Sequence, residues 1–251
     1  MRGQNIGAME DRNGNPSTPR TKRNYWKLII TLIKFGVKRK SISPELAERV
    51  KEVDLPKDIP KEVTIWTPSE FKEIINATRP ELIPNVALGG LAGLRTKEIN
   101  ELDWTDIDLD RKIVKVAAFK AKGRARRIVP LCDAAVAWLK PYAARTGKVA
   151  YYAETNKYAA AVMSDVQTAR ESKGYFSVPE WRRNALRHSY ISYRLAQVQN
   201  AHQVAIEAGN SENIIFKNYR EIVTQEEAKQ WFSIFPQKEQ NIIHMLPSAV
   251  S

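Results

Sequence analysis

The sequence predicts a mainly helical protein with one small antiparallel β-sheet. Apolar residues recur at helical spacing through most of the 251 residues, a length that can bury a substantial core. Between 103 and 131 the pattern changes to short apolar runs that are typical of strands joined by turns. A stretch with two prolines among charged residues, 54–63, separates an N-terminal helical segment from the remainder of the chain.

These changes in composition divide the chain into five segments. The first is rich in Asn, Gly, Pro and Arg, lacks apolar periodicity, and is expected to be disordered. The second is an amphipathic basic helix, with Trp26, Ile29, Ile33 and Val37 at helical spacing, followed by a short helix that starts near Ser43. The expected boundaries are 1–20 for the disordered N-terminus, 21–53 for the helical segment, 54–63 for the linker, 64–236 for the main domain and 237–251 for the tail.

The charge balance favours a polyanionic partner. The formal net charge is +12 and the isoelectric point is about 9.7, so nucleic acid is the simplest such partner. A basic protein without a nucleic-acid partner stays open as an alternative. With Cys132 as the only cysteine and three scattered histidines, neither an intramolecular disulfide nor a zinc site is expected. No stretch resembles a signal peptide or a membrane span, and we expect a cytoplasmic, reducing setting.

Local signals set several helix starts in the main domain. Thr67, followed by a proline and by Glu70, has the pattern of a capping box. Thr224 and Glu227 form a second such pattern. Pro84 opens a helix that ends near Leu94, and Arg95 begins the next. Further helices are expected at about 133–144 and 156–172, and one from Ser211 to near Val223.

The stretch 181–220 combines arginines with apolar residues. If it is helical from its start, Arg183, Asn184 and Arg187 share one face. A solvated helix face is the ordinary interpretation. The crowding of apolar residues favours partial burial instead, and a buried arginine needs an anionic partner. No such partner is evident nearby in the sequence, and a phosphate from outside would suit a planar guanidinium.

Five short motifs, in order, carry a resemblance to a known family. They are GLRTKEINEL at 93–102, KGRARRIVPL at 122–131, NALRHSYISY at 184–193, AGNS at 208–211 and FKNYRE at 216–221. Each is weak alone, but their order and spacing over the last three-quarters of the chain resemble the tyrosine recombinase (phage integrase) family. The resemblance implies the catalytic-domain fold of these DNA breaking-rejoining enzymes and DNA strand cleavage without metal or cofactor.

The resemblance also assigns roles. Tyr219 would attack a backbone phosphate to form a 3′-phosphotyrosyl bond, and Arg95 and Arg187 would hold the phosphate oxygens. Lys122, at the tip of the basic hairpin, would protonate the departing 5′ oxygen, with Lys120 as the competing candidate. Glu98 would support the site.

The sequence departs from the family pattern at two positions. Asn184 stands where the family usually has His or Lys, and Asn210 stands where it usually has His or Trp. Asparagine can donate a hydrogen bond to phosphate but cannot transfer a proton at neutral pH. If the family residue is a general base, the expected loss is about 10²–10⁴-fold. Arg183 could supply a missing positive donor. We count Arg183, Glu98 and His188 as supporting residues of the site.

The favoured interpretation is therefore a site-specific recombinase or integrase. The alternative is a DNA-binding protein of the same fold with weakened or no catalysis, and a weaker third is a basic helical protein with an RNA or ribosomal partner. The resemblance implies double-stranded DNA as partner, a homotetramer on synapsed DNA, and no membrane or small-molecule substrate. The segment 21–53 resembles the second half of the family's core-binding domain, so that this domain looks truncated.

Overall fold

The computed structural model describes residues 10, 14–54, 57, 63–117, 126–152, 154–175, 177, 179–219 and 223–237. The chain divides into two compact units, Met1–Lys61 and Glu62–Ser251. This division falls within the segment 54–63 that the sequence predicts to be a linker. The tail beyond Gln237 lies outside the described residues, as does most of the N-terminus before Gly14.

The first unit contains two helices, α1 (Pro19–Lys38) and α2 (Pro44–Lys51), that contact each other. Thr18 and Ser43 cap their N-termini, and each helix begins with the proline that favours a first helical position. Neither helix has a buried residue, and apolar side chains such as Leu28 and Leu32 are exposed. This unit therefore has no core of its own among its described residues.

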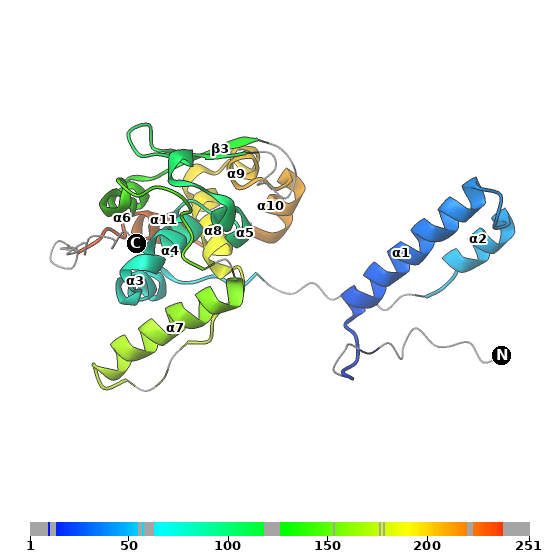
Figure 1. The fold of residues 1–251 in the computed structure, drawn as a ribbon, viewed down its shortest axis with the longest axis horizontal. Helices are drawn as coiled ribbons and strands as arrows, with labels where there is room; N and C mark the ends of the chain where they lie inside the picture. Colours follow the sequence, from blue (N-terminus) through cyan, green and yellow to red (C-terminus); the bar gives the residue numbers. More distant parts are fainter. Residues whose placement is uncertain are drawn as a thin grey trace, which may run out of the picture. The chain divides into compact units, whose positions relative to one another are not determined.

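The second unit is a helical domain built around α4 (Figure 1). All nine residues of α4 are buried, because it packs against α6 and α8 and has Asn85 as its only polar side chain. The elements of this unit, in order, are α3 (Pro68–Ala77), η2 (Pro80–Leu82), α4 (Ile83–Leu91), α5 (Thr96–Glu101), η3 (Trp104–Asp106), β1 (Ile107–Asp108), β2 (Ile113–Val116), β3 (Arg127–Pro130), α6 (Asp133–Leu139), η4 (Lys140–Tyr142), α7 (Thr155–Glu171), α8 (Ala185–Val198), α9 (Ala201–Ala208), α10 (Glu212–Tyr219) and α11 (Gln225–Phe232).

The three strands form one antiparallel sheet in the order β1-β2-β3. Val114 pairs with Val129 in the centre of the β2–β3 ladder, and both are fully buried. The predicted fold class, mainly helical with a small antiparallel sheet, is confirmed. Residues 118–125, which connect β2 to β3 and contain both Lys120 and Lys122, lie outside the described residues.

The local helix signals were correct where capping defined them. Both capping boxes form, at Thr67 with Glu70 and at Thr224 with Glu227. The prediction of a helix through 183–187 is wrong at its start, since α8 begins at Ala185 and Asn184 precedes it with φ of 60°. Arg183 and Asn184 therefore do not share a helix face with Arg187. Within the described part of the chain, no helix is long and apolar enough to cross a membrane.

Candidate active site

A tight turn after α4 brings Arg95 and Arg187 together. Gly93 has φ of 65°, a backbone conformation that glycine adopts without strain, and a Cβ there would lie 2.1 Å from the Tyr190 ring. The turn places Arg95 at the N-terminus of α5, and it exposes the Gly93 carbonyl, which accepts a hydrogen bond from the Arg187 guanidinium. Gly93 thus creates the backbone turn whose carbonyl holds Arg187.

The C-terminal end of α9 collects three arginines. The last carbonyls of a helix lack intrahelical partners and carry the negative end of the helix dipole. Here Arg127 Nε donates to the carbonyl of Glu207 at 3.1 Å, Arg187 donates to that of Ala208, and Arg95 donates to that of Gly209 at 2.6 Å. These backbone oxygens offset part of the repulsion between neighbouring cations. We call Arg95, Arg127 and Arg187 the arginine cluster.

Glu98 supplies the carboxylate that the cluster requires. It is 1% exposed and accepts hydrogen bonds from the backbone N and the guanidinium of Arg95, at 2.9 and 2.8 Å. Arg127 donates to both of its oxygens, at 3.0 and 2.7 Å. Burial alone would raise the pKa of Glu98, but the hydrogen bonds from Arg127 and Arg95 outweigh it and hold the pKa below its ordinary value.

Asn210 links the two arginines of the predicted site. Its Oδ1 accepts from Arg95 at 2.8 Å and from Arg187 at 3.2 Å. Since the amide oxygen serves both guanidinium groups, the Nδ2 group is left to donate elsewhere, and it makes no hydrogen bond to any other described residue. A shared acceptor of this kind fixes the spacing of two cations while presenting a further donor beside them.

Arg187 is buried with only neutral partners. It is 8% exposed, and its acceptors are two backbone carbonyls and an amide oxygen. Burial, with the charge of Arg95, lowers the pKa of Arg187 to about 9, which leaves it protonated at neutral pH. The neighbouring arginines differ: Arg182 pairs with Glu70 and Arg194 with Glu207. Arg187 is therefore the arginine of this stretch that an external anion would stabilise most.

Tyr219 is the last residue of α10 and is 5% exposed. Its hydroxyl lies 2.6 Å from His188 Nδ1, and the two ring centroids are 5.7 Å apart. Burial raises the pKa of Tyr219, although the charges of Arg187 and Arg95 act to lower it. Burial also lowers the pKa of His188, and the charge of Arg187 adds to this effect. Both rings are therefore neutral at pH 7.

The structure brings together Arg95, Glu98, Arg187, His188, Asn210 and Tyr219 from the residues that the sequence singled out. Arg183 and Asn184 are exposed, and neither makes a hydrogen bond to the arginine cluster within the described part of the chain. Sequence reasoning missed Arg127. The run RARR at 124–127 contains three arginines with nothing in the sequence to separate them. Only the register of β3 and the contact with the distant Glu98 identify Arg127 as the arginine of the cluster.

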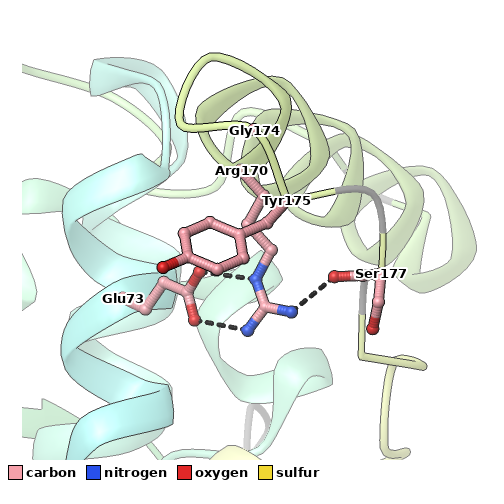
Figure 2. A pocket seen from close by; sticks show the side chains of 5 residues that line it. All are labelled: Glu73, Arg170, Gly174, Tyr175 and Ser177. Carbon is pink, nitrogen blue, oxygen red and sulfur yellow. Dashed lines mark hydrogen bonds and ion pairs between the residues drawn. The ribbon is translucent and has the colours of Figure 1, made fainter.

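A separate pocket of about 430 Å³ lies between α3 and the end of α7 (Figure 2). Its arginine, Arg170, points across the pocket to Glu73 and donates two hydrogen bonds to that carboxylate and one to the Ser177 carbonyl. The guanidinium therefore already has an internal anion. This pocket does not provide a vacant anion site, and no group of three His, Cys, Asp or Glu residues in the described ranges could hold a metal ion.

Comparison with known proteins agrees with this geometry. Residues 67–224 match the model of the phage integrase family. A relative from Chlamydia muridarum, named tyrosine recombinase XerC, is 30% identical over 129 residues, which cover 49% of this chain and 39% of the relative. The tyrosine recombinase XerC of Myxococcus xanthus is 30% identical over 137 residues, covering 52% and 44%. The chain thus spans less than half the length of these curated relatives.

Solved structures share the fold at low identity. The integrase of transposon Tn1549, solved with circular intermediate DNA, is 17% identical with a TM-score of 0.56, covering 84% of this chain and 78% of that one. Lambda integrase bound to DNA is 14% identical with a TM-score of 0.55, covering 81% and 74%. Because the family model spans more than half of the sequence, this chain belongs to the phage integrase family.

Proposed function

We propose that this protein is a site-specific recombinase that cuts and rejoins double-stranded DNA through a 3′-phosphotyrosyl intermediate. The observation that supports this most is the pair Arg95 and Arg187, held together by Asn210 next to a buried tyrosine whose pKa both arginines influence. Two guanidinium groups without a carboxylate for Arg187 suit a phosphodiester. The names of the similar proteins, tyrosine recombinase and integrase, point to the same chemistry.

Each residue has one role in the proposed reaction. The Tyr219 oxygen attacks phosphorus and forms the covalent bond, which conserves the phosphodiester energy for rejoining. Arg95, Arg187 and the Nδ2 group of Asn210 donate to the non-bridging oxygens, where negative charge grows in the transition state. Lys122, or Lys120 in its place, protonates the 5′ oxygen that leaves. Glu98 holds Arg95, Arg127 in turn holds Glu98, and neither of them touches the DNA.

The two departures from the family pattern fit this scheme unequally. Asn210 keeps a donor for phosphate and holds the two arginines together, so an asparagine in place of the family's usual residue is compatible with catalysis. Asn184 is exposed, outside the helix, and its amide cannot take up a proton. We therefore propose an active enzyme in which neither Asn184 nor Arg183 is essential. The assembly that we propose for it is a homotetramer on synapsed DNA.

The proposed domain organisation follows from the same family. Residues 64–236 carry the chemistry, residues 54–63 link them to the helices of 21–53, and those helices contribute further DNA contacts. α1 carries Lys27, Lys34 and Lys38 among its exposed residues and has no acidic residue in its first turn. Such a surface suits contact with the DNA backbone, where each neutralised phosphate adds to affinity in a salt-dependent way.

Replacement of Tyr219 by Phe tests the enzyme against the DNA-binding alternative. The change removes one oxygen and keeps the ring, so DNA affinity should stay near that of the wild type. Covalent adduct on nicked suicide duplexes should vanish rather than slow, because no other atom is placed to attack. The measurement is a denaturing gel for the adduct, run beside fluorescence anisotropy on the same duplexes at fixed salt.

Tyr175→Phe is the matched control, since Tyr175 is exposed beside the pocket of Figure 2 and should leave both readouts unchanged. A wild type that binds DNA as tightly as Tyr219→Phe but forms no adduct on any duplex of a random-sequence library would establish the DNA-binding alternative. Persistent adduct in Tyr219→Phe would show that another residue is the nucleophile.

A further inference from the structure

We infer that His188 is the proton acceptor for Tyr219, taking the hydroxyl proton at Nδ1 as the tyrosine oxygen attacks phosphorus. The inference rests on the proposed function and adds a catalytic group to it. It starts from the 2.6 Å contact between Nδ1 and the hydroxyl, a distance typical of a strong O–H hydrogen bond. No other described side chain bonds to this hydroxyl.

The position of His188 in the fold makes this contact rigid. His188 follows Arg187 on α8, and its backbone N donates to the Asn184 carbonyl at 2.9 Å in the first turn of that helix. Tyr219 ends α10, which packs against both α8 and α9. The same short stretch of α8 therefore fixes a phosphate-binding arginine and the partner of the nucleophile. A base that is oriented by the scaffold needs no rearrangement to act.

The departures from the family pattern give this contact its importance. Neither Asn184 nor Asn210 can accept a proton at neutral pH. Asn210 is also occupied, since its oxygen serves Arg95 and Arg187. His202 is an exposed histidine that pairs with Glu212. Among the described residues, His188 is the group at the hydroxyl whose ordinary pKa lies near neutrality.

The surroundings decide when the proton moves. Burial and Arg187 lower the pKa of His188, while burial raises the pKa of Tyr219. A phenolate–imidazolium pair is therefore unfavourable in the free protein, and the hydroxyl stays protonated until attack begins. A phosphodiester on Arg95 and Arg187 neutralises the charge that depresses the basicity of His188. Binding of DNA thus makes His188 a better acceptor at the moment it is needed.

Other ionisable groups near α8 have partners of their own. The helix α4 carries no ionisable side chain, and Glu207 of α9 is held by Arg194 and Tyr190. Glu227 of α11 caps its own helix at Thr224. Arg187 and Tyr219 are thus the charged or titratable side chains that act on the imidazole within the described parts of these helices.

The proton balance closes over one cycle. In cleavage the Tyr219 oxygen–phosphorus bond forms, the 5′ oxygen–phosphorus bond breaks, and the tyrosine proton passes to Nδ1. The departing 5′ oxygen takes a proton from the general acid proposed above. In rejoining, the 5′ hydroxyl attacks phosphorus and returns its proton to that acid, while His188 gives its proton back to the Tyr219 oxygen.

His188→Asn is the decisive variant, because the Asn Oδ1 stands close to the position of Nδ1 and can still accept a hydrogen bond, but it cannot take up a proton. We expect adduct formation on the suicide duplexes that wild type cleaves to slow by about 10²–10⁴-fold. DNA affinity should be unchanged. Wild-type cleavage should fall at pH values below the pKa of His188, and this acidic limb should be lost in the variant. His202→Asn, the same change on an exposed histidine, should have no effect.

Two chemical substitutions separate a proton acceptor from a residue that merely packs. A 5′ sulfur leaving group needs no proton, so it should rescue a Lys122→Ala variant while leaving the His188→Asn deficit in place. A fluorotyrosine at 219, whose hydroxyl is more acidic, should shrink that deficit. Equal cleavage by His188→Asn and wild type would overturn the inference alone, whereas a wild type without adduct would overturn the proposed function with it.

The free protein provides a test that needs no activity. If Nδ1 accepts the Tyr219 proton, the neutral imidazole must carry its own proton on Nε2. Nitrogen-15 NMR of selectively labelled histidine at pH 7, assigned with His188→Asn, should show Nδ1 unprotonated. A ring protonated at Nδ1 would donate to the tyrosine oxygen instead, and it would refute the inference regardless of which DNA is cleaved.

Discussion

Replacement of Glu98 by Gln should destabilise the second unit far more than the same replacement of a carboxylate in a partly exposed ion pair. Glu98 accepts four hydrogen bonds, from Arg95 and Arg127, and is 1% exposed. Glutamine keeps the shape but replaces one acceptor oxygen by an NH₂ group that faces guanidinium donors. At least one charge-assisted interaction becomes repulsive, and two arginines lose their counter-ion.

The magnitude follows from burial. Breaking a buried ion pair by removing one partner costs about 3–5 kcal/mol, because the remaining charge has no compensation. Glu73→Gln is the matched control, since Glu73 also receives a bidentate arginine, from Arg170, but the pair is 34% and 24% exposed. Because water reaches both partners of this pair, its contribution should be much closer to the roughly 0.2–1 kcal/mol of surface pairs. The two variants make the same change, from Glu to Gln opposite a bidentate arginine, but in ion pairs that differ in burial.

Urea denaturation of both variants at pH 7 gives the comparison. The pKa of Glu98 in the folded protein lies below the ordinary value of 4.5, so its contribution to stability is complete above pH 4.5. That contribution is lost as pH falls through the depressed folded pKa, and the gap between wild type and Glu98→Gln should narrow there. A Glu98→Gln variant no less stable than Glu73→Gln would refute the idea that Glu98 holds the arginine cluster together.

Two further predictions concern the loops around the cluster. Asn210→Ala removes the oxygen shared by Arg95 and Arg187, and the rate of adduct formation should fall by about 10²–10³-fold at nearly constant DNA affinity. The neutral ring of Asn210→His has one acceptor nitrogen for two arginines, so its rate should lie between those of wild type and Asn210→Ala. A rate above that of wild type would contradict the bridging role. Gly93→Ala should lower the free energy of unfolding by more than about 2 kcal/mol, because it adds a clash with Tyr190 to the strain of the left-handed backbone. Gly174, with φ of 79°, has open space around it, so Gly174→Ala should show the backbone strain alone, about 1–2 kcal/mol. Thermal or urea unfolding of the pair measures the difference, and equal losses would rule out the contact.

Local features of the fold were predictable because their causes are local. The capping boxes at Thr67 and Thr224 join residues three apart, and the change of period near 107 marks the sheet. The start of α8 was predicted wrongly because Asn184 adopts a left-handed conformation, which helical spacing alone does not reveal. The residues at helical spacing extend N-terminal to the true start of the helix at Ala185.

The sequence motifs indicated the residues of the candidate site but not the contacts between them and the rest of the fold. Motif order pointed to Arg95, Arg187, Asn210 and Tyr219 without any knowledge of their contacts. The partners that hold these side chains in place come from far along the chain: Arg127 is 29 residues from Glu98, and Arg187 is 94 residues from the Gly93 carbonyl. No sequence pattern encodes such pairs, because the tertiary packing of α4, α8 and α9 creates them.

The charge of the cluster suits the proposed catalysis as well as binding. Three guanidinium groups face one carboxylate, Glu98, and the end of α9, whose dipole supplies roughly half a negative charge. The residual charge is therefore about +1.5. A phosphodiester in the ground state carries one negative charge, whereas the transition state of the proposed attack by Tyr219 would place a second on the same non-bridging oxygens. In the proposed reaction, the positive cluster would attract the transition state, with two negative charges, more strongly than the bound DNA, with one, and this difference, rather than affinity itself, would lower the barrier. Glu98 and the α9 carbonyls thus set the net charge of the cluster as well as the positions of its guanidinium groups. With further acids near Arg187 the site would bind DNA weakly, and without Glu98 the three arginines would repel one another and could not be held together.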